Sequence, residues 1–340
     1  MKAKSEQAAE EDHVSEKIIQ KRSILHSLLG LFHAGVALAF FSAVLGYFGS
    51  YYFLIDLFSH FRLVYSLAFV LGIVVALLTS QKVFLRLWVL AFFINGFSVF
   101  SMFYPDSTAK ADSNGHSLRV MTINVLRSNS EKQAVTDAIL KHNPDILIAV
   151  EVDQPWARVF SEALSAQWPH ALVDDRFDNY GVLIYSKFPL IQGESFESPM
   201  AYVPTIRAEV KLGEDSCVVY GVHTFPPMSD FNATALQSQL ADIAQRVSRE
   251  TKPVILMGDL NSTPWSAYFK RFLRNSGLVD SQQGFGPQSS WPTNLPYIGL
   301  PIDHVLISPE IFVKTRKIGS HNGSDHRPVY ADLVIPKRIQ

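Results

Sequence analysis

The sequence has a single cysteine, Cys217, among its 340 residues. One cysteine excludes an intrachain disulfide and any zinc site built from several cysteine thiolates. The residues around it, from Ser216 to Tyr220, form an apolar, strand-like run. We therefore interpret Cys217 as a small buried residue rather than a nucleophile.

The chain also lacks an excess of charge of either sign. It carries 30 Lys and Arg residues against 31 Asp and Glu residues, and residues 118–340 carry 21 against 23. Proteins that bind duplex nucleic acid without sequence preference usually have a basic surplus. Such binding is disfavoured here. Basic clusters at Lys270, Arg271 and Arg274 and at 314–317 could contact phosphates, but we interpret them mainly as solvated faces.

Charged side chains are nearly absent from residues 24–104, where Asp56, Arg62, Lys82 and Arg86 are the only ones. Hydrophobic residues make up 48% of the whole sequence, which is high for a protein with no membrane segment. A helix needs about 20 apolar residues to cross the hydrocarbon core of a bilayer. The sequence therefore predicts three transmembrane helices, at about 25–48, 63–79 and 83–104.

The basic residues near these helices indicate an orientation. Several Lys and Arg residues precede the first helix, and Lys82 and Arg86 lie at the second turn. The positive-inside rule places the N-terminus and this turn in the cytoplasm. Three crossings then leave the C-terminal part on the extracytoplasmic side of the cell membrane, whether inner or plasma membrane. We expect residues 1–23 to be a cytoplasmic polar tail, disordered over Met1–Glu16, and residues 105–117 to be a linker.

From residue 118 onward, short apolar runs alternate with longer helical patterns, which is typical of an α/β domain with mixed sheets. The expected helices are 130–141, 156–166, 233–249 and 266–275. The expected strands are 119–124, 145–151, 181–185, 205–212, 217–222, 254–258, 302–307 and 328–334.

Polar side chains capable of catalysis gather where these strands begin or end. Ligand sites in α/β proteins commonly form at strand ends, so we expect these side chains to meet in one site. They are Asn124, Glu151, His223, Asp259, Asn261, Asp303, Asp325 and His326.

Six short sequence fragments around these polar residues, in this order and spacing, resemble the endonuclease/exonuclease/phosphatase superfamily. This superfamily includes deoxyribonucleases, abasic-site endonucleases, sphingomyelinases and inositol-polyphosphate phosphatases. The resemblance covers about 118–335. It implies a four-layer α/β sandwich, with two mixed β-sheets packed face to face and helices outside. It also implies a catalytic domain at 118–340 that cleaves a phosphoester with a divalent metal ion. The fragments are Thr122–Val125, Ile148–Glu151, Val222–Thr224, Gly258–Asn261, Ile302–His304 and Ser324–Pro328.

The resemblance also implies roles for individual residues. His326 would be the general base that activates water, and Asp303 would orient its imidazole. Asp259 and Asn261 would contact the attacking water and the phosphoryl oxygens, and His223 would donate to the phosphate or the leaving group.

Glu151 would hold Mg²⁺ or Mn²⁺, with Asn124 and Asp325 close to the ion. The sequence leaves two roles open for Arg207. It could bind a phosphate as a clamp, or it could be a strand residue that faces outward. The expected partners are a phosphoester substrate and the bilayer, with nucleic acid possible but not favoured, and the oligomeric state is not predicted.

Three functions remain open from the sequence. The first is a membrane-anchored phosphodiesterase or phosphatase acting on a lipid or small phosphoester. The second is an anchored extracytoplasmic nuclease. The third is a binding protein on the same fold that has lost catalysis, although no position of the polar set is replaced by an apolar residue.

The predicted orientation can be tested with a reporter fused after Gln340. We expect an alkaline phosphatase fusion to be active and a green fluorescent protein fusion to be dark, because the C-terminus lies outside the cytoplasm. The opposite pattern would mean that one apolar segment, the short middle one first, does not cross the membrane.

Overall fold

The computed structural model describes residues 2–105 and 115–337, which form two compact units. One unit comprises Met1–Val44 and Tyr65–Asn95, and the other comprises Leu45–Val64 and Gly96–Gln340. The segment between the first two apolar helices therefore belongs to the second unit, a grouping that the sequence did not suggest. Residues 106–114 of the expected linker lie outside the described residues.

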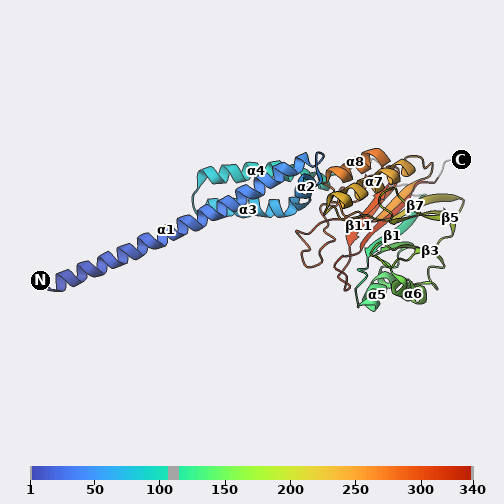
Figure 1. Cartoon of the computed structure of the whole chain (residues 1–340), viewed down its shortest axis with the longest axis horizontal. Coiled ribbons are helices and arrows are strands. Elements are labelled where there is room, and N and C mark those ends of the chain that lie inside the picture. Colours follow the sequence, from blue (N-terminus) through green and yellow to red (C-terminus); the bar gives the residue numbers. More distant parts are fainter. Residues whose placement is uncertain (1, 106–114, 338–340) are drawn as a thin grey trace. The chain divides into compact units, whose positions relative to one another are not determined.

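The first unit is built from most of the helices α1 (Lys2–Leu45), α3 (Arg62–Leu78) and α4 (Lys82–Phe100), labelled in Figure 1. The last residue of α1, the first three of α3 and the last five of α4 belong to the second unit. Within the described residues, three segments are long and apolar enough to cross a membrane: Ile19–Phe48, Phe53–Leu78 and Lys82–Phe103. Trp88 is 4% exposed and donates a hydrogen bond from Nε1 to Nδ1 of His33 over 3.0 Å.

The expectation of a disordered stretch at Met1–Glu16 is wrong, because α1 already begins at Lys2. This stretch is rich in Ala, Glu, Gln and Lys, which are among the residues that favour helix most. The apolar helix that follows directly provides a nucleus, so helical structure can extend from it into this stretch.

The second unit contains two six-stranded mixed sheets. The first sheet has, in spatial order, β11 (Phe312–Ile318), β12 (Val329–Ile335), β1 (His116–Asn124), β2 (Ile146–Val150), β4 (Val182–Ser186) and β3 (His170–Asp174). The second has β5 (Leu190–Glu197), β6 (Pro204–Leu212), β7 (Asp215–His223), β8 (Val254–Asp259), β10 (Asp303–Ile307) and β9 (Val279–Asp280).

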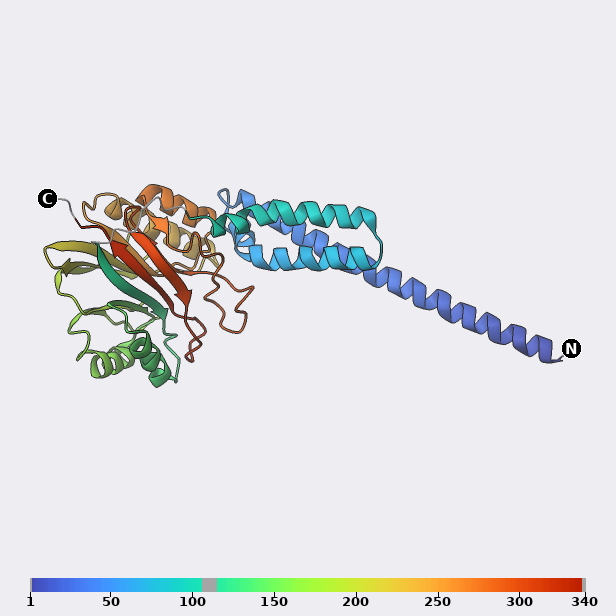
Figure 2. The same cartoon turned by 180° about the vertical axis from the view of Figure 1, so that it is seen from behind.

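Helices cover the outer face of each sheet, so the unit has the four layers that the resemblance implies (Figures 1 and 2). The helices α5 (Lys132–His142) and α6 (Gln154–Leu164) pack on the first sheet, and α7 (Asp230–Val247) and α8 (Ala267–Ser276) pack on the second. A third apolar cluster fills the space between the sheets, with Ile148 from β2 and Ile206 from β6 fully buried in it.

All eight expected strands and all four expected helices are present, with ends shifted by a few residues. Four strands were not expected: β3, β5, β9 and β11. Each of them lies at an edge of its sheet. The remaining short elements are α2 (Phe53–Leu57) and the 3₁₀ turns η1 (Gly46–Phe48), η2 (Phe58–Phe61) and η3 (Ser101–Phe103).

Candidate active site

The site is organised around Asp259, the last residue of β8, which is 1% exposed. Strand pairing places it between two other polar side chains, because Asp259 pairs with His223 of the parallel strand β7 and with Asp303 of the antiparallel strand β10. Gly258, just before it, has φ of +145°, and a Cβ atom there would lie 1.8 Å from the carbonyl oxygen of Val222. Only glycine allows the two strands to approach this closely.

His326 and Asp303 form the shortest link in the site. Nδ1 of His326 lies 2.8 Å from Oδ2 of Asp303, and both residues are buried. Because a carboxylate only accepts hydrogen bonds, Nδ1 carries the proton of this bond. Nε2 of His326 is then turned towards Asp259, whose Oδ2 is 3.7 Å away. This arrangement orients an imidazole with Nε2 available for proton transfer.

Burial and mutual charge shift the pKa values of these groups. Burial opposes the charged form of His326, but the carboxylates of Asp303 and Asp259 outweigh it and raise the pKa of His326 to about 10. Burial, followed by the charge of Asp303, raises the pKa of Asp259 to about 6. For Asp303, the charge and hydrogen bond of His326 overcome burial and lower its pKa. The ion pair with Asp303 thus favours the protonated form of His326.

Glu151 and Asn124 approach Asp259 from the other sheet. Asn124 ends β1, and its Nδ2 donates to Oε1 of Glu151 over 2.9 Å and to Oδ2 of Asp259 over 3.1 Å. The backbone N–H of Arg127 donates to the second oxygen of Glu151. Glu151 has φ of +62°, a strained value for a residue with a long side chain. Such strain is typical of functional positions, where surrounding contacts impose it.

His223 and Asn261 complete the polar set. Nε2 of His223 lies 3.7 Å from Oδ2 of Asp259. The backbone N–H of Asn261 donates to Oδ1 of Asp259, and its side-chain amide donates to the carbonyl of Thr224. Asn261 also has a positive φ, of +45°. The structure thus brings these two residues to the Asp259 carboxylate, as the strand-end argument predicts.

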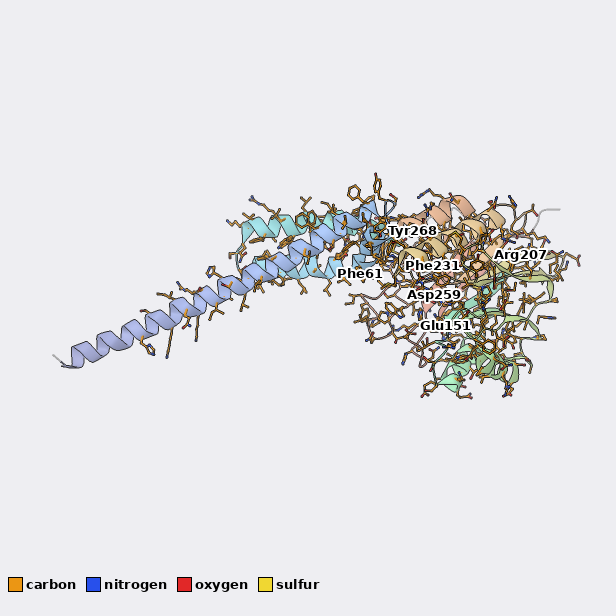
Figure 3. The ribbon with its side chains drawn as sticks, in the orientation of Figure 1. Phe61, Glu151, Arg207, Phe231, Asp259 and Tyr268 are labelled. Atoms are coloured by element: carbon orange, nitrogen blue, oxygen red, sulfur yellow. The ribbon has the colours of Figure 1, made fainter. Side chains whose placement is uncertain are left out.

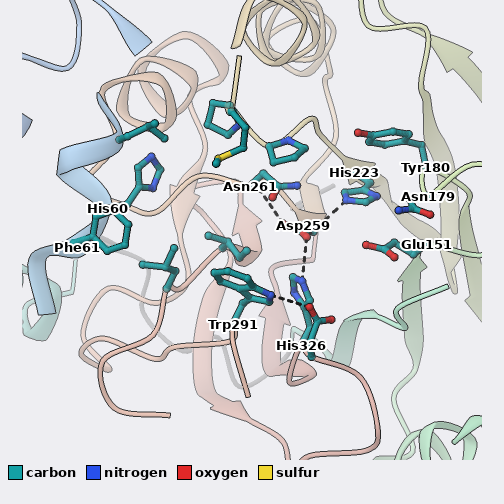
Figure 4. Close-up of a pocket in the computed structure, with 17 residues that line it drawn as sticks. His60, Phe61, Glu151, Asn179, Tyr180, His223, Asp259, Asn261, Trp291 and His326 are labelled. Carbon is teal, nitrogen blue, oxygen red and sulfur yellow. Dashed lines mark hydrogen bonds and ion pairs between the residues drawn. The ribbon is translucent and has the colours of Figure 1, made fainter. Parts of the chain in front are cut away.

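These residues open into a cavity of about 580 Å³. Figure 4 shows Glu151, His223, Asp259 and His326 on one part of its wall. Asp303 is not among the lining residues and lies behind His326. Most of the remaining wall is apolar. It is formed by Leu57, Phe61, Tyr180, Pro226, Pro227, Met228, Trp291, Leu300 and Ile302.

Part of this wall comes from the segment between the first two apolar helices. Asp56 holds this segment against the start of α8, because its carboxylate accepts from Oγ of Ser266 over 2.6 Å and from the backbone N–H of Ala267 over 2.7 Å. Nδ1 of His60 accepts from the backbone N–H of Thr263 over 3.3 Å. Phe61, next in the chain, reaches the cavity opposite Glu151 (Figure 4).

The oxygen-rich part of the cavity suits a hard divalent cation. Oδ2 of Asp325 accepts from Nε1 of Trp291 over 2.9 Å, whereas Oδ1 is buried and has no hydrogen-bond partner among the described residues. A buried carboxylate oxygen of this kind calls for a ligand. Glu151 lines the same cavity. Asn124, in contrast, presents its amide N–H group to the carboxylates and therefore orients them.

A second set of donor atoms, from Asp259, Asp303 and His326, lies within 4.8 Å of one another. An ion held by Nδ1 of His326 or by Oδ2 of Asp303 would compete with the 2.8 Å bond between these two atoms. The same geometry also suits an oriented imidazole beside a carboxylate.

Arg207 is not brought into the site. Its side chain points to the face of β6 opposite Ile206, because successive strand residues alternate between the two faces. There its guanidinium makes two hydrogen bonds, of 2.7 and 2.9 Å, with the carboxylate of Glu250. Arg207 also lies apart from Glu151 and Asp259 in Figure 3. The structure therefore pairs Arg207 with Glu250 and does not place it at the cavity that holds Asp259.

Sequence reasoning missed two contributions to the cavity. Tyr180 lines it, and its ring lies 5.1 Å from that of His223. Burial, with smaller effects from Asp178, Glu151 and Asp259, raises the pKa of Tyr180 to about 12, so the phenol stays protonated and can donate a hydrogen bond. The other is the segment 57–61. Only Tyr180 could have been found from the sequence, because it lies just before the apolar run that forms β4, whereas no local pattern marks the segment 57–61 as part of the cavity.

Comparison with known proteins agrees with this geometry. The sequence model of the endonuclease/exonuclease/phosphatase family matches residues 121–326, which is more than half of the chain. The chain belongs to the endonuclease/exonuclease/phosphatase family. Members of this family are phosphoester hydrolases that typically use a divalent metal ion. No match was found among curated proteins.

Solved structures share the fold of the second unit. An endonuclease/exonuclease/phosphatase from Beutenbergia cavernae is 22% identical, with a TM-score of 0.53 over 64% of this chain and 72% of its own. A D. rerio TDP2 complexed with single-strand DNA product is 15% identical, with a TM-score of 0.52 over 65% and 98%. A mannosyl-6-phosphatase from Bacteroides thetaiotaomicron is 17% identical, with a TM-score of 0.54 over 64% and 100%.

Replacing Asp303 with Asn tests the ion pair with His326. The pKa of His326 rises from 6.5 to about 10 on folding, so the pair stabilises the fold below pH 6.5 and loses this effect as pH rises through about 10. In chelator-treated full-length protein, we expect Asp303→Asn to lower the Tm by about 5 °C or more at pH 6.5.

The Tm difference between the wild type and Asp303→Asn should shrink as pH rises to about 10. A Tm difference that stays constant with pH would show that His326 is not held as a cation by Asp303.

Proposed function

We propose that the protein is a membrane-anchored, metal-dependent hydrolase that cleaves a phosphoester carrying an apolar group. The observation that supports it best is the composition of the cavity wall. An oriented imidazole and the carboxylates of Asp259 and Glu151 face a cavity that is otherwise mostly apolar. Such a site suits a substrate with a phosphate at one end and hydrocarbon at the other.

In this proposal His326 takes the proton of the attacking water at Nε2, and Asp303 keeps the imidazole oriented through Nδ1. Asp259, with its pKa near 6, and Asn261 position the water and the phosphoryl oxygens. His223 donates to the phosphate or the leaving group. Its Nδ1 is buried without a hydrogen-bond partner among the described residues.

Glu151 and Asp325 would hold the metal ion, and Asn124 would orient Glu151. A bound Mg²⁺ or Mn²⁺ supplies positive charge that neutralises the phosphate and lowers the pKa of nearby groups. The carboxylates of Asp303 and Asp259 raise the pKa of His326, and a positive charge nearby would lower it again and so favour the neutral imidazole that accepts a proton. Metal binding and the function of His326 as a base are thus coupled.

The anchor and the charge balance favour a lipid-like substrate over duplex DNA. Three helices are apolar enough to cross a membrane, and the domain from 118 to 340 has no basic surplus. Tethering keeps the enzyme close to surface phosphoesters and raises their effective concentration. We place the catalytic unit on the extracytoplasmic side of the cell membrane, as the distribution of Lys and Arg indicates.

A nuclease acting on single strands is the second candidate. Tyr180 and Trp291 both line the cavity, and aromatic rings of this kind can stack on unpaired bases. The D. rerio TDP2 structure contains a single-strand DNA product, although its 15% identity supports similarity of fold alone. Activity on single-stranded DNA that exceeds activity on phospholipid would favour this candidate.

The mechanism predicts a large loss on replacing His326 with Ala. With Mg²⁺ or Mn²⁺ and a soluble aryl phosphodiester, kcat/KM should fall by about 10² to 10⁴, the usual contribution of a general base. His321→Ala is the matched control, because this exposed histidine lies five residues away in the same loop and outside the cavity. Wild-type turnover should also stop with a chelator and return with added metal.

Equal turnover in wild type and His326→Ala would exclude this mechanism. No turnover by the wild type on aryl phosphodiester, phospholipid vesicles or single-stranded DNA would favour the third candidate, a binding protein on the same fold.

Phe61 tests the class of substrate. We expect Phe61→Ser to lower kcat/KM for a long-chain phospholipid by about tenfold, which corresponds to a loss of about 1.4 kcal/mol of contact between the partly exposed ring and the substrate. Turnover of a short soluble phosphodiester should stay within about twofold, because that substrate does not reach the apolar wall. Phe177→Ser is the control: Phe177 is 94% exposed and lies outside the cavity. A parallel loss on both substrates would show that Phe61 supports the fold rather than the selection of substrate.

A further inference from the structure

A second cavity in the catalytic unit, of about 220 Å³, shares no lining residue with the first. Four of its lining side chains are cationic: Arg62, Lys270, Arg271 and Arg274. Three come from α8, and Arg62 is the first residue of α3, more than two hundred residues earlier. Sequence reasoning favoured a solvated helix face for the α8 cations, but it had no means of bringing Arg62 to them.

Helix geometry gathers the α8 cations on one side. Lys270 and Arg274 are four residues apart and Arg271 and Arg274 three, so they are neighbours on the helix surface. The opposite side of α8 is buried in the apolar core through Phe269 and Phe272. Like charges at these spacings destabilise a helix, and a fourth cation beside them adds to the repulsion.

Arg62 is held rigidly in this cluster. It is 1% exposed, and its guanidinium lies over the ring of Tyr47, 3.9 Å from the ring centroid. Tyr47 and Trp265 supply aromatic walls to the cavity. The guanidinium group carries a planar set of donors, which is the geometry that suits the oxygens of a phosphate group.

No acidic side chain lines this cavity among the described residues. The acidic group whose charge acts on Lys270 is Asp56, and its carboxylate is already bonded to Ser266 and Ala267. Partial desolvation and the charge of Arg62 lower the pKa of Lys270. Four cationic side chains and no carboxylate thus line the cavity among the described residues.

We propose that this cavity binds a phosphate-bearing anion, with the headgroup of an anionic phospholipid as the natural source. Tyr47 lies at the end of the apolar segment Ile19–Phe48, and Arg62 is the first residue of α3. The ends of membrane-spanning helices lie at the level of the lipid headgroups, where Arg, Lys and Tyr are enriched. The site is separate from the reacting centre, so it would bind a lipid without cleaving it.

The test uses the full-length protein in neutral detergent and native mass spectrometry of bound lipid. We expect the wild type to retain phosphatidylglycerol in preference to phosphatidylcholine. The double variant Arg271→Gln/Arg274→Gln should bind phosphatidylglycerol about thirtyfold more weakly, since two cations near an anionic lipid together contribute about 2 kcal/mol. Both side chains are exposed, so the fold should survive.

The double variant Arg158→Gln/Arg249→Gln is the matched control. It removes the same charge from exposed positions on α6 and after α7, outside the cavity, and should bind phosphatidylglycerol as the wild type does. The charge-preserving variant Arg271→Lys/Arg274→Lys should retain most of the binding. It gives a second measurement if the Gln variant does not fold.

Inorganic phosphate distinguishes the two sources of the anion. If millimolar phosphate raises the Tm of the wild type but not of the Gln variant, and phosphatidylglycerol is not retained, the ligand is a free phosphate. Selective retention of phosphatidylglycerol identifies a lipid. Equal responses of the wild type and the Gln variant to both probes would overturn the proposal. Turnover of a soluble phosphodiester by the same variants keeps this result independent of the catalytic site.

Discussion

The buried carboxylate of Asp259 is the constraint on which the catalytic unit depends. It accepts hydrogen bonds from Asn124 on one sheet and from the backbone of Asn261 on the other, and it lies 3.7 Å from both His223 and His326. A buried carboxylate is tolerated only when such partners compensate for the lost hydration. The face-to-face packing of two sheets supplies them, because strand ends from both sheets meet at this point.

Sequence patterns predicted the parts of this arrangement that are locally encoded. Central strands such as β2 and β8 are continuous apolar runs, since both of their faces are buried. The four missed strands all lie at sheet edges, where one side faces solvent. β5 is the clearest example: six of its eight residues are exposed, so no apolar pattern marks it.

The candidate site was predicted as a set of residues but not as a geometry. A polar residue at the end of an apolar run is a local signal, which is why Asn124, Asp259 and His326 could be named. The pairing of Arg207 with Glu250, in contrast, depends on which face of β6 the side chain takes. The contact of Asp56 with Ser266 joins positions 210 residues apart, and no local pattern indicates it.

The segment around Asp56 gives the catalytic unit its particular character. It contributes Phe61 to the apolar wall of one cavity and Arg62 to the basic wall of another. Two successive residues thus line two chemically different cavities. Phe61 lines the mostly apolar cavity beside the reacting centre, and Arg62 lines the basic cavity beside α8. The family fold supplies the reaction chemistry. The chain around Asp56 adds an apolar side chain and a cation to the surroundings of that site.

The most direct measurement of the central claim is the activity of Asp259→Asn with a soluble phosphodiester and saturating Mn²⁺. This change preserves the shape of the side chain and removes its charge. Our account predicts that kcat/KM falls by at least about a hundredfold while Mn²⁺ binding persists, because the preorganised contact with the water and phosphoryl oxygens is lost. Turnover within about twofold of the wild type would show that the reacting centre is not built around Asp259.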